Sequence, residues 1–287
     1  MGNATKATVL IAGCGYVGIP LAEKLTRAGH TVYGLRRDPS TLPEAIIPVA
    51  ADLTKPLPAD LIPEPLDAVF YTASATGKRE PSVYRSIYVD GPTQVQTWLQ
   101  AHHPACRRFI FTSSTSVYGQ TDGSWIDEDA PTENPTFSGS LMREGEVRVL
   151  ASALPSIVVR FSGIYGPGRH RLIHQVAEGQ AWVPEEPRYL NHLHQEDCAG
   201  VLAHLMQLEH PKSLYLASDH EPADRADVLT WIAGELGVPL VSGAEPMRRS
   251  DSNKRCRNDR LLASGYMFIH PTFREGYARE IARYVGK

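Results

Sequence analysis

The 287-residue sequence has no apolar run long enough to cross a lipid bilayer. Residues 1–6 are polar and lead directly into an apolar strand, so the hydrophobic core of a signal peptide is missing as well. From these two absences we expect a cytoplasmic protein without a membrane partner.

Cysteine is scarce, with only Cys14, Cys106, Cys198 and Cys256. No two of them stand at the spacing of a zinc site or a redox motif, which favours free thiols in a reducing compartment. An excess of one charge is also missing, because 29 Lys and Arg against 32 Asp and Glu give a formal net charge of −3. Nothing in this balance favours nucleic acid as a partner.

Short apolar runs alternate with helical patterns through the first 165 residues. The runs that indicate buried strands are 8–12, 31–35, 46–50, 67–72, 108–113 and 156–161, and the helical patterns are 17–28, 81–102 and 139–153. Such alternation is typical of right-handed βαβ units. The fold class expected is therefore α/β, a Rossmann-type doubly wound parallel sheet.

The last third of the chain changes character. Helical patterns at 195–208, 223–236 and 272–285 accompany one short strand at 213–217, and stretches rich in Pro and Gly at 119–137, 163–170 and 183–188 are predicted as loops. We expect a Rossmann domain over residues 6–165 and a smaller C-terminal substrate lobe over 166–287, packed together as one unit.

The sequence GCGYVG at 13–18 is a GxGxxG pattern between a predicted strand and a predicted helix. In that context Gly13 permits a tight turn, Gly15 lets the backbone approach a pyrophosphate, and Gly18 lets the helix pack on the strand. The helix N-terminus then offers free N–H groups to phosphate. The pattern predicts a dinucleotide site, and the alternative is a glycine turn that binds nothing.

Arg36 and Arg37 stand at the end of the second strand, where NAD-binding proteins usually place Asp or Glu. A guanidinium group attracts the 2′-phosphate of NADP, whereas a carboxylate repels it. The pair favours NADP over NAD, and solvated arginines with NAD as cofactor are the alternative. Asp52, after the third strand, is placed to accept from the adenine amino group or to serve as a turn residue.

Four motifs in this order resemble the extended short-chain dehydrogenase/reductases, the NAD-dependent epimerase/dehydratase family. They are GCGYVG at 13–18, TSSTSVYG at 112–119, RFSGIYGPG at 160–168 and HLHQEDCAG at 192–200. The resemblance implies an NAD(P)-binding Rossmann fold. The cofactor-binding residues that we assign are Gly13, Gly15, Tyr16, Val17, Gly18, Arg36, Arg37, Asp52, Leu53, Thr72, Ala73, Ser74, Thr112 and Ser113.

In this family a Ser or Thr acts with a Tyr-x-x-x-Lys pair. The hydroxyl residue maps to Ser114, but Ser138 stands at the Tyr position and Met142 at the Lys position. The family's Tyr transfers the proton, and its Lys lowers the pKa of that Tyr. Serine is a much weaker acid and methionine has no charge, so the resemblance identifies the chain as an atypical member.

Two tyrosines are candidates for the missing acid or for the substrate wall. Tyr118 is assigned with Ser114 to catalysis, and Tyr165 is assigned to the substrate. Packing roles for both phenols are the alternative. Ser116, Arg169 and His194 complete the substrate residues that we assign, because they lie in segments that the family uses to meet substrate.

A metal site is not expected. His192 and His194 stand two residues apart, but no third ligand follows at helical spacing. Basic residues crowd the stretch 248–260, which predicts either contacts to an anionic small-molecule substrate or a solvated basic loop paired with carboxylates.

The leading functional hypothesis is an atypical NADP-dependent oxidoreductase acting on a carbonyl or hydroxyl substrate, with Ser114 orienting that group. The first alternative is a non-catalytic NAD(P)H-binding redox sensor or regulatory protein. The second is a nucleotide-sugar epimerase or dehydratase with relocated acid and base residues. The resemblance also implies a homodimer formed through the helices near 81–102 and 139–153.

Overall fold

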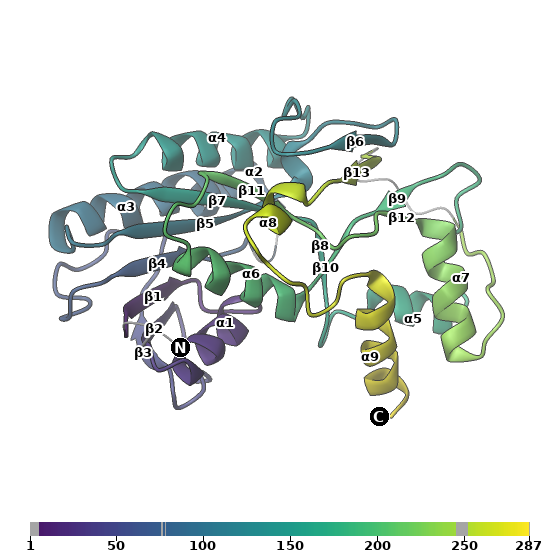
Figure 1. The fold of residues 1–287 in the computed structure, drawn as a ribbon, viewed down its shortest axis with the longest axis horizontal. Helices are drawn as coiled ribbons and strands as arrows, with labels where there is room; N and C mark the ends of the chain where they lie inside the picture. Colours follow the sequence, from purple (N-terminus) through teal and green to yellow (C-terminus); the bar gives the residue numbers. More distant parts are fainter. Residues whose placement is uncertain (1–5, 76, 78, 245–251, 287) are drawn as a thin grey trace.

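The computed structural model describes residues 6–75, 77, 79–244 and 252–286 and is built on a seven-stranded parallel sheet (Figure 1). The strand order is β11-β7-β5-β4-β1-β2-β3. The strands are β1 (Thr8–Ala12), β2 (Thr31–Arg36), β3 (Ile47–Ala50), β4 (Ala68–Tyr71), β5 (Arg108–Ser114), β7 (Ser156–Phe161) and β11 (Leu214–Ala217). The predicted fold class, a Rossmann-type doubly wound α/β sheet, is confirmed.

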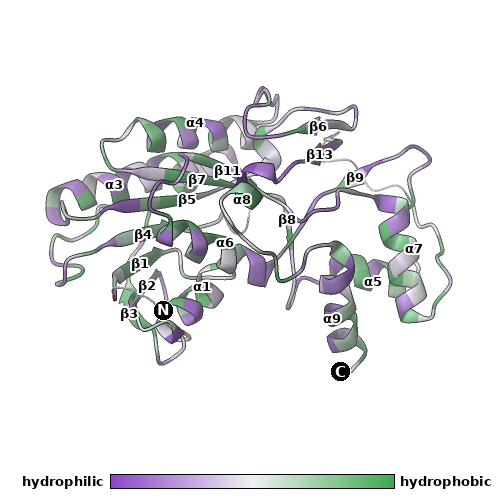
Figure 2. Ribbon diagram, viewed as in Figure 1, coloured by the Kyte–Doolittle hydropathy of each residue, from purple (hydrophilic) through white to green (hydrophobic). Residues whose placement is uncertain are grey.

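Helices cover both faces of this sheet. On one face lie α1 (Gly18–Arg27) and α6 (Gln195–Gln207), and on the other lie α3 (Gly91–His102) and α4 (Phe137–Ala151). Val9 and Ile11 of β1 pack toward α1 and α6, whereas Leu10 and Ala12 pack toward α3 and α4. Because both faces are covered, the inner strands of the sheet are largely apolar (Figure 2).

The chain changes direction across the sheet next to β1. From β1 it continues to β2 and β3 at one edge, and it then returns to place β4 on the other side of β1. In open α/β sheets this switch point leaves a crevice at the carboxyl ends of the strands, where ligands bind. The carboxyl end of β1 is the glycine-rich loop.

The single helix expected over 81–102 is three segments: α2 (Pro81–Arg85), the π-helix η1 (Ser86–Asp90) and α3. Pro92 has no N–H to continue the ladder, and the Tyr71 hydroxyl donates to the Ile87 carbonyl at 2.6 Å. Only glycine fits at position 91, because a Cβ there would lie 2.3 Å from that hydroxyl. A wider turn results, which the periodicity did not predict.

Two segments expected to be loops contain short strands. Within 119–137 lies β6 (Ser124–Ile126), paired with β13 (Lys254–Cys256), and within 163–170 lies β8 (Gly163–Tyr165), paired with β10 (His192–His194). A further pair joins β9 (Tyr189–Leu190) to β12 (Ala223–Asp224). Strands of two or three residues carry too little pattern to be predicted, and distant partners hold them in place.

The segment after residue 165 contributes to both parts of the molecule. Helices α5 (Arg171–Ala177), α7 (Arg225–Leu236) and α9 (Phe273–Val285) surround an apolar cluster of their own, at the right of Figure 1. The short helix α8 (Asp259–Ala263) packs against β11. In contrast, β11 completes the main sheet beside β7, and α6 packs on α1.

Helix α6 is tied to the sheet at its C-terminal end. The guanidinium group of Arg108, at the start of β5, donates to three carbonyl oxygens there, of Leu205, Met206 and Leu208, at 2.6–2.8 Å. Among the described residues, no helix is long and apolar enough to cross a membrane.

Candidate functional site

A cavity of about 700 Å³ lies at the carboxyl edge of the sheet. The carboxyl end of β5 and the loops that follow β1, β2, β3, β4 and β7 all contribute to its lining. The residues assigned to the cofactor that line it are Gly13, Gly15, Tyr16, Val17, Arg36, Arg37, Asp52, Leu53, Thr72, Ala73, Ser74, Thr112 and Ser113. Residues at the carboxyl ends of six strands are thus brought to one cavity.

The glycine-rich loop is held in place by its neighbours. The backbone N–H groups of Gly13 and Cys14 both donate to the Leu35 carbonyl at 2.9 Å. Gly13 has a φ of +90°, and a Cβ there would lie 2.4 Å from the backbone of Ala73. Gly18 does not line the cavity, and a Cβ on it would approach Ile11 to 3.0 Å. Both glycines therefore have the packing roles predicted from the pattern.

The N-terminus of α1 is open to an anion. No side chain caps this end, and the first turn of the helix contains no acidic residue. Free N–H groups and the positive end of the helix dipole therefore face the cavity beside Gly15 and Val17. This arrangement suits a phosphate group.

Two guanidinium groups lie at the end of β2. Arg36 and Arg37 line the cavity, and neither side chain makes a hydrogen bond or ion pair with any residue that the structure describes. Asp52 lines the same region but accepts from the backbone N–H and the hydroxyl of Thr54 at 3.0 and 2.8 Å. These bonds keep the pKa of Asp52 below its usual value and give it the turn role that the sequence left open.

Ser113 and Ser114 end β5 with different partners. The Ser113 hydroxyl donates to Glu146 at 2.6 Å, and the fully buried Glu146 accepts two bonds from Arg160 at 2.7 and 2.9 Å. The Ser114 hydroxyl accepts from the Ser116 N–H at 3.1 Å and lines the cavity. Of the two, Ser114 has its proton available for a bond to a ligand.

The structure places Tyr118, which the sequence assigned to catalysis, away from the cavity. Tyr118 is fully buried, does not line the cavity, and donates its hydroxyl proton to the Asp127 carbonyl at 2.7 Å. Its oxygen accepts from Arg160 at 2.7 Å, and burial raises its pKa. Ser116, assigned to the substrate, is outside the lining and belongs to the short 3-10 helix η2 (Thr115–Val117).

Ser138 and Met142, which the sequence analysis assigned to the family's Tyr and Lys positions, have different surroundings. Met142 lines the cavity with its thioether side chain. Ser138 is buried, and its hydroxyl accepts a bond from the guanidinium of Arg79 at 2.7 Å. Sequence reasoning missed Arg79, which comes from the loop after β4.

One phenol that the sequence did not single out lies at the cavity. Tyr88 of the π-helix lines it, and its oxygen accepts from the Ala75 N–H at 3.0 Å. Burial raises the pKa of Tyr88, and the bond from Ala75 opposes that rise. The hydroxyl proton therefore remains free to be donated. Ser162, with a buried hydroxyl that finds no partner among the described residues, also lines the cavity.

The remaining residues assigned to the substrate are divided between the cavity and the interior. Arg169 lines the cavity, and its guanidinium lies 3.9 Å from the centre of the Tyr16 ring. Tyr165 is buried away from the cavity and stacks on Tyr277 with ring centres 4.4 Å apart. His194 is also buried and outside the lining. Direct contact with a substrate in this cavity is therefore excluded for Tyr165 and His194 in this conformation.

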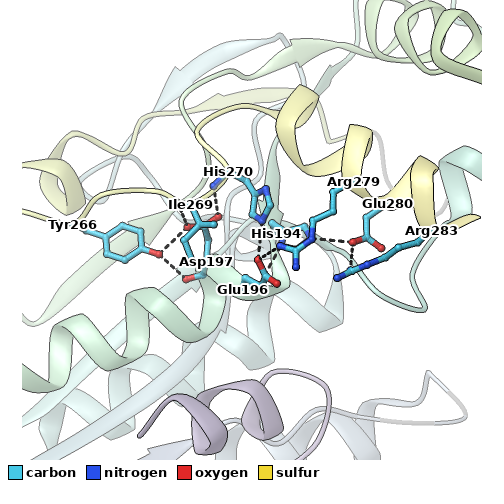
Figure 3. Close-up of polar contacts among 9 residues, drawn as sticks. All are labelled: His194, Glu196, Asp197, Tyr266, Ile269, His270, Arg279, Glu280 and Arg283. Carbon is cyan, nitrogen blue, oxygen red and sulfur yellow. Dashed lines mark hydrogen bonds and ion pairs between the residues drawn. The ribbon is translucent and has the colours of Figure 1, made fainter. Parts of the chain in front are cut away.

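His194 belongs instead to a histidine–carboxylate cluster, which we define as His170, His194, Glu196, His270 and Glu280. Figure 3 shows all of these residues except His170. Ligand atoms of His194, Glu196 and His270 lie within 4.8 Å of one another, close enough to hold a metal ion. The sequence did not suggest this set because His270 comes from the distant segment before α9.

Ion pairs already occupy both carboxylates of that cluster. Glu196 accepts from Arg279 at 2.6 Å, and Glu280 accepts from Arg283. Burial, followed by the nearby imidazole of His270, lowers the pKa of His194 to about 4. At neutral pH the imidazole is therefore uncharged, and the cluster joins β10, α6 and α9 as an ion-paired network.

The basic stretch 248–260 lies partly outside the described residues, including Arg248 and Arg249. Of the described members, Arg255 lies between the rings of Trp125 and Tyr189, at 4.9 and 4.6 Å. Arg260 pairs with Asp129 at 2.9 Å. These partners match the alternative of a paired basic loop.

Known proteins resemble this chain in sequence and in fold. The family model described as the NAD dependent epimerase/dehydratase family matches residues 9–214. A candidate NAD-dependent epimerase/dehydratase from Methylobacillus flagellatus has a structure 35% identical to this chain, with a TM-score of 0.82, covering 98% of this chain and 100% of that one.

Two further proteins are similar over nearly their full length. A Streptomyces protein named 3-diazoavenalumate denitrifying reductase is 27% identical over 95% of this chain and 99% of its own. The enzyme WbmG of Bordetella bronchiseptica, solved in complex with NAD, is 17% identical with a TM-score of 0.80, covering 99% of this chain and 95% of that one. At that identity WbmG shows the fold alone.

Proposed function

Since the chain belongs to the NAD-dependent epimerase/dehydratase family, we propose that it is an oxidoreductase that uses NADP in preference to NAD. Its substrate is a small molecule with a carbonyl or hydroxyl group. One observation carries the proposal: a single cavity joins the glycine-rich loop, the two unpaired guanidinium groups at the end of β2, and the hydroxyls of Ser114 and Tyr88.

The residues of the cavity fit such a cofactor from end to end. The uncapped N-terminus of α1 suits the diphosphate, and Gly13 and Gly15 leave room for it. Arg36 and Arg37 suit the 2′-phosphate that distinguishes NADP. When bound, the nicotinamide supplies or accepts hydride. Ser114 of β5 and Met142 of α4 line the part of the cavity between these two elements.

The chain's own residues must hold and move the proton. The Ser114 hydroxyl donates a hydrogen bond to the substrate oxygen and so orients the substrate. In the reductive direction Tyr88 gives its phenolic proton to that oxygen as hydride reaches the carbon, and water returns a proton to the phenolate. The Ala75 N–H, which already donates to the Tyr88 oxygen, stabilises the negative charge that remains there.

Direct titration of the purified protein with NADPH, NADH and their oxidised forms tests the cofactor. We expect NADPH to bind most tightly, and Arg36→Asp to reverse the preference toward NADH. The variant Arg36→Gln removes the cation without adding a negative charge, and so separates lost attraction from new repulsion. A protein that binds none of the four nucleotides contradicts the proposal.

Turnover is tested with a panel of aldehydes, ketones and quinones, following oxidation of NADPH. Loss of a general acid lowers rates by about 10²–10⁴-fold, and we expect a fall of that order in kcat for Tyr88→Phe. Tyr84→Phe is the matched control, because Tyr84 packs against Tyr88 with ring centres 5.3 Å apart but does not line the cavity. Equal activity in both variants rejects Tyr88 as the acid.

The second candidate is a non-catalytic NAD(P)H-binding sensor or regulatory protein. Ser138 and Met142 favour this candidate. The Ser138 hydroxyl is already bonded to Arg79, and the Met142 side chain carries no charge. Such a protein would bind NADPH and change shape without consuming it. Tight binding with a change in proteolysis pattern and no turnover across the panel would favour the sensor over the enzyme.

A further inference from the structure

Arg169 brings a cation from the C-terminal half of the chain to the glycine-rich loop. Its guanidinium lies 3.9 Å from the centre of the Tyr16 ring, and Tyr16 is the fourth residue of that loop. Both residues line the cavity together with Gly13, Gly15 and Val17. The arginine is therefore at the end of the cavity where the phosphates of a dinucleotide would lie, and not at the end formed by Ser114 and Met142.

The turn that carries Arg169 is firmly supported. The Arg169 N–H donates to the Gly166 carbonyl at 2.9 Å, and Gly166 and Gly168 have φ angles of +136° and +76°. A Cβ on Gly166 would lie 3.3 Å from the Tyr16 hydroxyl and 3.2 Å from Nε2 of His194. The turn thus packs between the loop and the histidine–carboxylate cluster of Figure 3.

The charge of Arg169 is not neutralised by the protein. Among the residues that the structure describes, its side chain has no hydrogen bond or ion pair, and its contact is with the Tyr16 ring. The uncapped N-terminus of α1 begins directly after the same loop. Two sources of positive potential therefore meet at one cavity, and the first turn of α1 has no acidic residue to oppose them.

From this geometry we propose that Arg169 binds the diphosphate of the dinucleotide together with the α1 N-terminus, with the Tyr16 ring as its platform. The inference rests on the proposed function and deepens it, because it moves Arg169 from the substrate to the cofactor. A planar guanidinium matches two phosphate oxygens at once, which a lysine does not. The ring restricts the side chain, so less rotamer freedom is lost on binding.

Two fragments of the cofactor test this assignment in the full-length protein. They are 2′-phospho-ADP-ribose, which contains the diphosphate, and adenosine 2′-monophosphate, which does not. We expect Arg169→Gln to weaken binding of the first by roughly ten- to a hundredfold and to leave the second unchanged. Arg169→Lys should recover only part of the loss, and Tyr16→Leu should give a smaller loss than Arg169→Gln.

Arg171→Gln is the matched control. Arg171 is an exposed arginine two residues further along, at the start of α5, and it does not line the cavity. Its removal changes the net charge equally and should leave both affinities unchanged. The slope of affinity against salt concentration should fall for Arg169→Gln and not for Arg171→Gln.

The two levels of the proposal fail in different ways. If the unaltered protein binds neither fragment, nor ADP-ribose or adenosine, the dinucleotide site itself is rejected, and this inference with it. If it binds them and Arg169→Gln leaves the ratio of the two affinities unchanged, the dinucleotide site stands and the role of Arg169 is overturned. An equal loss for both fragments also overturns it, because that result indicates collapse of the loop.

Discussion

Charged groups are used in opposite ways in the cavity and in the histidine–carboxylate cluster. Arg36, Arg37 and Arg169 line the cavity without a hydrogen bond or ion pair to any described residue. In the cluster, Glu196 and Glu280 each have an arginine of α9 as partner. Unpaired cations at a water-filled surface cost little and attract anions, whereas paired charges in a buried position hold segments together. Changes in the two regions should therefore affect different measurements.

The largest effect on stability should come from the cluster. Glu280 is fully buried and accepts from His170 at 2.7 Å as well as from Arg283. Glu280→Gln removes the charge but keeps the volume, and breaking such a pair costs about 3 kcal/mol of unfolding free energy. Urea denaturation measures the loss, and Glu209→Gln, at an almost fully exposed carboxylate, is the control. A loss below about 0.5 kcal/mol would show that the network contributes no stability.

Lowering the pH should destabilise the histidine–carboxylate cluster. Burial lowers the pKa of His194 to about 4, below the value of about 6.5 expected in the unfolded chain. The unfolded state therefore takes up the proton first, and stability present above pH 6.5 is lost as the pH falls toward 4. The shift corresponds to roughly 3 kcal/mol. Denaturation curves between pH 7 and 4 should be flatter for His194→Gln, and identical slopes contradict the assignment.

Changes in the cavity should affect NADPH affinity and leave stability nearly unchanged. Arg36→Gln removes an unpaired cation, so the unfolding free energy should change by less than about 0.5 kcal/mol. Affinity for NADPH should nevertheless fall by roughly tenfold or more, because a charge-assisted contact to phosphate is lost. Thermal unfolding with and without NADPH measures both quantities in one experiment. A lower melting temperature of the free variant would mean that Arg36 is structural.

The smallest effect is expected where the two regions meet. The Tyr16 hydroxyl is buried without a hydrogen-bond partner in the described part of the chain, and burial raises its pKa to about 12. Tyr16→Phe keeps the ring beneath Arg169 and removes an unsatisfied polar group. We expect unchanged cofactor affinity and unfolding free energy within about 1 kcal/mol of the original or higher. A marked loss of either would reveal a water or ligand bonded to that hydroxyl.

The local features of the site could be predicted from the sequence. Strand β1, the loop at 13–18 and helix α1 are contiguous, so their roles follow from hydrophobic periodicity and glycine geometry. The arginines after β2 were also found by position alone. In an α/β sheet, the carboxyl ends of parallel strands meet at one edge, and residues at the ends of six strands therefore line one cavity.

Features that depend on distant partners could not be predicted. Tyr88 lines the cavity because Pro92 interrupts the helix ladder and Tyr71 holds the Ile87 carbonyl, which hydrophobic periodicity does not describe. The motif around Tyr118 suggested an accessible phenol, but its oxygen accepts a hydrogen bond in the interior from Arg160, 42 positions later in the sequence. The rings of His270 and His194 lie with centres 3.9 Å apart, although the two residues are distant in the sequence.

The place of β11 in the sheet has a consequence for synthesis of the protein. Until residues 214–217 leave the ribosome, β7 is an edge strand, although Ile157, Val158 and Val159 are buried in the finished molecule. Helix α6, which Arg108 anchors, is equally late. We therefore expect the nascent Rossmann half to expose an apolar edge and an uncovered face, which favours aggregation until the chain is complete.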